Sequence, residues 1–113
     1  MRIHFTGRHI EVTDALKEHT TSKLERLERL VDSSVEARVT FTVEKYRHEA
    51  DVSIRTAGYS FVVTKQTDDM YSAVDRVIDT LERKIRRHKE RLTDRRTKGT
   101  GLQPPIIDDS DQV

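Results

Sequence analysis

Residues 69–92 place the strongest constraint on the fold, because an apolar stripe and a dense basic run share one helical period. Apolar residues recur here at steps of three, four or seven: Met70, Val74, Val77, Leu81, Ile85 and Leu92. That spacing predicts a helix with one buried side. The basic run consists of Arg83, Lys84, Arg86, Arg87, Lys89 and Arg91. All six are expected to lie off the stripe, so the helix should show a cationic face to solvent.

This basic run destabilises the helix that carries it. Cations near a helix C-terminus complement the helix dipole, which explains part of the run. However, Arg83, Arg87 and Arg91 follow one another at i, i+4 spacing, where each like-charge pair costs about 0.2–0.5 kcal/mol. Glu90, four residues after Arg86, is the one acid expected to offset the repulsion. Such a face indicates binding to a polyanion, with a merely solvated face as the alternative.

The net charge of +1 hides a segregation of charge along the chain. Residues 83–98 contain nine Lys or Arg and two acids, a net charge of +7. Residues 99–113 carry a net charge of −3, and residues 1–82 also carry −3. The charge that would face a polyanion is therefore local to the predicted helix.

Length and composition predict one thin, two-layer domain. The chain has 113 residues, of which 34% are hydrophobic and 36% charged, which suits a sheet covered by helices. No apolar run approaches the ~20 residues of a membrane span, and the N-terminus lacks the apolar stretch of a signal peptide. We therefore expect a cytoplasmic protein with no membrane partner. The absence of cysteine excludes disulfides, thiolate zinc sites and thiol catalysis.

Alternating and helical patterns predict the remaining elements. Residues 2–7 alternate as a strand does, and Thr13 can cap a helix whose stripe includes Leu16, Leu24 and Leu27. Three further strands are predicted at residues 35–46, at 50–56 and from residue 59 onwards. Their short connections favour an antiparallel meander.

The expected fold class is α+β: a βαβββα two-layer sandwich, with a four-stranded sheet and two helices on one face. After Leu92 the apolar periodicity stops, and glycines and prolines interrupt the backbone. We therefore predict a domain over residues 1–95 and a disordered tail over residues 96–113.

No arrangement of residues indicates catalysis or metal binding. The five histidines lie on different predicted elements without the spacing of a metal motif. No glycine-rich phosphate loop or nucleophile elbow is present. Asp68 and Asp69 are better explained as cap and dipole partners of the helix that follows. We expect no enzymatic activity, no cofactor, no metal site and no small-molecule substrate.

Two separated motifs resemble a known family. Residues 69–75 (DMYSAVD) and 81–89 (LERKIRRHK) are similar to the signature of the ribosome hibernation promoting factors, also called ribosome-associated inhibitors or sigma modulation proteins. Residues 9–16 (HIEVTDAL) and 23–27 (KLERL) resemble that family's opening. Ser72 stands where alanine is more usual. The likeness covers residues 1–92 and makes the chain similar to the short members, which lack a second, dimerising domain.

The resemblance implies a fold similar to double-stranded RNA-binding domains and a position in the tRNA and mRNA channel of the small ribosomal subunit. There the protein would block initiation and protect idle ribosomes, and it would be a monomer when off the ribosome. The tail favours members that keep ribosomes single over those that assist ribosome pairing. The residues expected to contact ribosomal RNA are Arg76, Arg83, Lys84, Arg86, Arg87, Lys89, Arg91, Lys23, Arg26 and Tyr71.

Three alternatives stay open at this point. Tyr71 could stack on a base or could lie at the edge of the core with its hydroxyl in water. The basic face alone would also suit a general double-stranded nucleic-acid-binding protein. The older sigma-modulation name suggests a protein-interaction modulator of a transcription factor.

Overall fold

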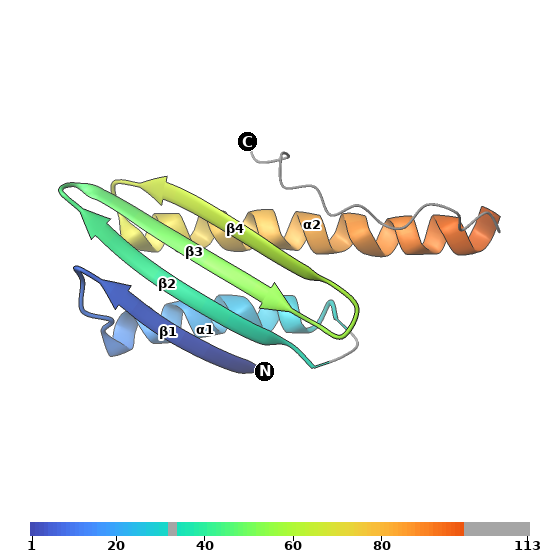
Figure 1. The fold of residues 1–113 in the computed structure, drawn as a ribbon, viewed down its shortest axis with the longest axis horizontal. Helices are drawn as coiled ribbons and strands as arrows, with labels where there is room; N and C mark the ends of the chain where they lie inside the picture. The colour runs from blue at the N-terminus through green and yellow to red at the C-terminus, as the bar shows by residue number, and fades with distance from the viewer. Residues whose placement is uncertain (32–33, 99–113) are drawn as a thin grey trace.

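Strands and helices follow one another in the predicted βαβββα order in a computed structural model of the chain (Figure 1). The elements are β1 (Arg2–Arg8), α1 (Asp14–Glu28), β2 (Glu36–Glu44), β3 (Arg47–Arg55), β4 (Ser60–Thr67) and α2 (Met70–Lys98). The structure describes residues 1–31 and 34–98, with side chains up to residue 90. α2 continues past the expected domain boundary at residue 95, and the rest of the predicted tail lies outside the described residues. No helix in the described part has the length and apolarity needed to span a membrane.

The sheet has the strand order β1-β2-β3-β4. β2, β3 and β4 pair antiparallel, so the predicted meander is confirmed. β1 pairs parallel to β2, with Ile3 opposite Ala37 and Phe5 opposite Val39. A parallel pair needs a crossover connection, and α1 supplies it. Both helices cover the same face of the sheet, as predicted (Figure 1).

The turn between β2 and β3 is tighter than the sequence pattern predicted. β2 ends at Glu44 and β3 begins at Arg47, whereas we expected strands over 35–46 and 50–56. Lys45 adopts a left-handed backbone conformation, with φ of 59°, which reverses the chain within two residues. The alternation was correct, but it did not reveal where the chain turns.

The predicted caps of both helices are present. The Thr13 Oγ1 accepts a hydrogen bond from the Leu16 amide at 3.2 Å. At α2, the Asp69 carboxylate accepts from the Ser72 amide at 3.0 Å, which confirms Asp69 as a cap. Each cap satisfies an amide of the first turn that has no partner within the helix.

The core lies between the sheet and the two apolar helix stripes. Met70, Val74, Val77, Leu81 and Ile85 are each at most 4% exposed. They pack in one cluster with α1 and with the inward residues of β2, β3 and β4. The predicted stripe of the long helix is therefore confirmed as far as residue 85, and the Leu92 side chain lies outside the described residues.

Lys84 contradicts the prediction that all six basic residues lie off the stripe. It is only 5% exposed, because it lies on the side of α2 that carries Leu81 and His88, three residues before and four after it. His88 is also buried, and its ring centroid is 4.2 Å from that of Tyr59. The side of α2 that packs on the sheet is thus wider than the apolar stripe alone.

Gly7 and Gly58 allow a matched test of how closely the backbone of β1 approaches the segment before α1. A Cβ added at Gly7 would lie 2.5 Å from the Ile10 carbonyl oxygen and 2.9 Å from Val12 Cγ2, whereas one added at Gly58 meets no atom within 4 Å. We expect Gly7→Ala to lower the free energy of unfolding by about 1–3 kcal/mol, because the backbone must move. Gly58→Ala should change it by less than about 1 kcal/mol. Urea denaturation measures both, and equal losses would contradict the packing described here.

Candidate nucleic-acid interface

Three arginines form a row on the side of α2 that faces away from the sheet. Arg76, Arg83 and Arg87 are all exposed and lie seven and four residues apart, so they share one side of the helix. The row is about 16 Å long at the rise of an α-helix. Arg83 Nη2 donates a hydrogen bond to Thr80 Oγ1 at 3.3 Å. We call these three residues the outer arginine row.

Arg86 and Lys89 are exposed, but each binds a group within the protein. The Nε and Nη2 of Arg86 both donate to Glu82 Oε2, at 3.1 and 3.0 Å. Glu82 therefore supplies the offset that we predicted from Glu90, and it stands on the favourable, N-terminal side of the arginine. The Lys89 Nζ donates to the Leu30 carbonyl oxygen at 2.8 Å, just beyond the end of α1.

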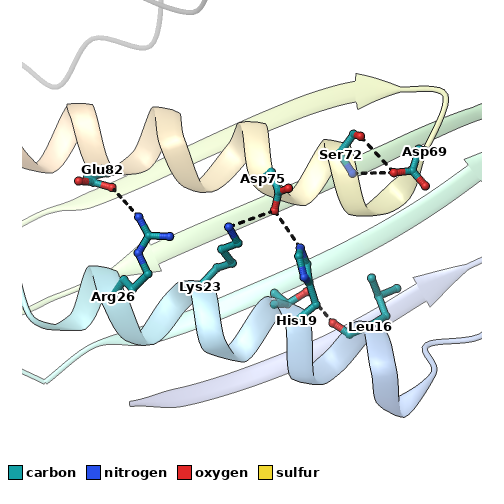
Figure 2. Close-up of polar contacts among 9 residues, drawn as sticks. Leu16, His19, Lys23, Arg26, Asp69, Ser72, Asp75 and Glu82 are labelled. Carbon is teal, nitrogen blue, oxygen red and sulfur yellow. Dashed lines mark hydrogen bonds and ion pairs between the residues drawn. The ribbon is translucent and has the colours of Figure 1, made fainter.

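Ion pairs join the two helices along a seam that Figure 2 shows. His19 Nε2 lies 2.8 Å from Asp75 Oδ1, and Lys23 Nζ lies 3.6 Å from the same oxygen. Arg26 Nη2 lies 3.9 Å from Glu82 Oε1. α1 thus supplies one histidine and two cations, Lys23 and Arg26, to this interhelix seam, and α2 supplies the acids. Two predicted RNA contacts, Lys23 and Arg26, have partners inside the protein before any ligand binds.

Tyr71 lies at the end of the same seam. Tyr71 is 39% exposed. Its ring contacts the His19 ring edge to face, with the ring centroids 5.0 Å apart and the ring planes at 74°. One side of the tyrosine is thus packed against α1, while the rest reaches solvent. This position suits the core-edge interpretation, and base stacking stays a prediction.

The predicted site residues therefore fall into separate groups. The outer arginine row and the interhelix seam lie on different sides of α2, Lys84 is buried, and the Arg91 side chain lies outside the described residues. Sequence reasoning missed the role of Asp75 and Glu82. Their spacing of seven residues on one helix side was the available signal. Among the described residues, no group of three or more acids and histidines is placed to hold a metal ion.

A small α+β domain with cations gathered on the outer side of one long helix has the features of a polyanion-binding protein. The model of the family described as Sigma 54 modulation protein / S30EA ribosomal protein matches residues 3–93. The chain belongs to this family.

Relatives named ribosome hibernation promoting factor agree with this assignment. One from Azotobacter vinelandii is 33% identical over 106 residues, covering 94% of this chain and 99% of the relative. One from Escherichia coli K12 is 35% identical over 92 residues, covering 81% of this chain and 97% of the relative.

Two solved structures share the fold. The N-terminal domain of Thermus thermophilus Protein Y superposes with a TM-score of 0.74 at 32% identity, covering 77% of this chain and 98% of that one. A ribosomal subunit interface protein from Coxiella burnetii gives 0.72 at 27% identity, covering 80% and 99%. These comparisons support the family and the fold, while the predicted likeness to double-stranded RNA-binding domains stays a prediction.

The ion pairs of Glu82 can be tested by comparing Glu82→Gln with Glu90→Gln, because both substitutions change the net charge by the same amount. We expect Glu82→Gln to lower the free energy of unfolding by up to about 1 kcal/mol, because this substitution removes the ion pairs with Arg86 and Arg26. Glu90→Gln should have a smaller effect. Thermal denaturation at low and high salt measures the difference, which salt should reduce. Equal losses in the two variants would contradict the pairing.

Proposed function

We propose that the chain is a ribosome hibernation factor that binds the small ribosomal subunit in the tRNA and mRNA channel through α2. It would inhibit translation and preserve idle ribosomes, and its place of action would be the cytoplasm. Family membership and the printed names of the relatives support the ribosome as partner. The observation that carries the binding surface is the outer arginine row, which the fold leaves exposed on the side of α2 away from the core.

Guanidinium groups suit the contacts that this function needs. Arginine offers parallel donors that match phosphate oxygens, and its charge does not depend on pH in the physiological range. Phosphate contacts fix position without reading base sequence, so binding should follow RNA shape. Inhibition then results from occupying space that tRNA and mRNA require, and no catalytic group is involved.

Exposure and the contacts already made within the protein support an order among the proposed RNA contacts. We place the outer arginine row first, because its three side chains are exposed on the side of α2 away from the sheet. Arg86, Lys89, Lys23 and Arg26 lie closer to α1 or to Glu82, and on binding RNA they would share or exchange those contacts. Lys84 is buried and is left out of the proposed surface. Arg91 stays a predicted contact, since its side chain lies outside the described residues.

Cosedimentation with purified small subunits across a salt series tests this surface. We expect Arg83→Glu/Arg87→Glu to weaken binding at every salt concentration. The slope of the logarithm of the binding constant against the logarithm of the salt concentration should become less steep by about 0.7–0.9 for each lost phosphate contact. Circular dichroism should show an unchanged fold, because both side chains are exposed.

Arg8→Glu/Arg47→Glu is the matched control. Both arginines are exposed at the sheet end where α2 begins, far along the chain from the basic run. This variant carries the same charge change and should retain most of the binding. If both double variants bind alike, net charge and not the outer arginine row governs the interaction. Excess duplex RNA as competitor separates a shape-matched ribosome binder, which stays bound, from a general nucleic-acid binder, which is stripped.

A further inference from the structure

The open face of the sheet carries a second group of cations that the function proposed above does not use. Strand residues alternate between the two faces, so those between the core residues point away from the helices. In the pairing register Arg38 lies opposite Ser53, and Arg55 lies opposite both Glu36 and Ser60. Charged and hydroxyl side chains of three neighbouring strands thus stand side by side.

These side chains surround a hollow in the sheet surface. It has a volume of about 370 Å³ and is lined by Glu36, Arg38, Ser53, Arg55 and Ser60. The lining therefore combines two guanidinium groups and two hydroxyl groups with a single carboxylate. Guanidinium and hydroxyl donors are the groups that bind phosphate oxygens in proteins.

The charges of the hollow are unevenly matched. Glu36 Oε2 lies 3.3 Å from His4 Nε2, so the one acid already has a partner on β1. Within residues 1–31 and 34–90, Arg38 and Arg55 form no ion pair and no side-chain hydrogen bond. Arg2, also exposed, stands opposite Glu36 in the register and adds a further cation beside the hollow. An anion that enters the hollow would therefore contact these two guanidinium groups without having to displace a carboxylate.

The hollow lies at the same end of the molecule as the basic run, but on the opposite face. Tyr59, which precedes β4, packs against His88 of α2, and Phe61 lies 6.1 Å from His88 between ring centroids. Arg55 pairs with Ser60, between these two aromatic residues in the chain. The sheet above His88 therefore carries the hollow, and the helix beneath carries Arg83 and Arg87. Along the shortest principal axis the backbone extends over only 16 Å, so the two cationic surfaces lie close together through the domain.

We propose that this hollow is a second RNA phosphate-binding site, so that the cationic end of the domain holds RNA on both faces. The choice of RNA rests on the proposed function, because a domain inserted into a channel walled by RNA meets phosphates on both sides. The charges of the sheet residues determine where on the sheet the RNA backbone would bind. Glu49 and Asp51 stand in the rows beyond Ser53 and repel a backbone there, whereas the rows with Arg38 and Arg55 attract it.

The test uses the full chain labelled with ¹⁵N and a short oligouridine RNA as probe. We expect the amide signals of Ser53 and Ser60 to shift on titration, and not to shift in Arg38→Ala/Arg55→Ala. The salt slope of small-subunit binding should flatten by about 0.7–0.9 for each arginine removed, as for any lost phosphate contact. Glu36→Gln should tighten RNA binding, an effect that a purely structural role of Glu36 would not produce. Arg8→Ala/Arg47→Ala, at the other end of the same face, should behave as the unmodified chain does.

The outcomes separate this site from the proposed function. If small subunits fail to bind the unmodified chain while Ser53 and Ser60 still shift with oligouridine, the proposed function fails and the sheet site stands. If the outer arginine row proves essential while Arg38→Ala/Arg55→Ala has an unchanged salt slope and unmoved amides, the sheet site is overturned. Equal shifts with inorganic phosphate, or with polyglutamate, a polyanion that has no phosphate groups, would also overturn the assignment to RNA.

Discussion

Burial of the α2 stripe against the sheet is the interaction on which the rest of the structure depends. Each fully buried aliphatic side chain of this kind contributes about 1.5–3 kcal/mol relative to an exposed one, and the stripe runs from Met70 to Ile85 without interruption. Because the buried residues share one side, they fix the rotation of the helix about its axis. That rotation decides which cations face solvent, which face α1 and which are buried. The position of the charge is therefore a consequence of packing.

The number of cations in the sequence overstates the charge that a ligand can reach. Arg86 is held by Glu82, Lys23 by Asp75, and Lys89 by a carbonyl group at the end of α1. Exposed ion pairs such as the first two are individually weak, typically up to about 1 kcal/mol. All three contacts nevertheless hold their side chains in place, and within the basic run Glu82 offsets the charge of Arg86. The outer arginine row is exposed on the side of α2 away from the sheet, and the arginines around the sheet hollow are exposed on the other face of the same end.

The sequence was sufficient to predict the element order, the meander and both caps, because hydrophobic periodicity and helix capping act locally, but it misplaced the turn between β2 and β3. It could not predict that β1 runs parallel to β2, since Ile3 and Phe5 alternate identically in either direction. Lys84 was missed because a long aliphatic stem can be buried beside an apolar stripe, and periodicity does not give the width of the packed side. Glu82 and Glu90 are both four residues from Arg86, so the spacing alone did not choose between them. The interhelix seam depends on how far apart α1 and α2 lie, which only the fold determines.

The most direct measurement uses the absence of cysteine from the chain. Asp79→Cys, exposed beside the outer arginine row, can carry an iron chelate that cleaves nearby RNA through hydroxyl radicals. In complexes with small subunits we expect cuts in the ribosomal RNA that lines the tRNA and mRNA channel, and a different pattern from Gln66→Cys on the sheet face. Cuts from residue 79 that lie outside the channel, or no cuts at all in a complex that forms, would contradict the placement of α2 against the RNA.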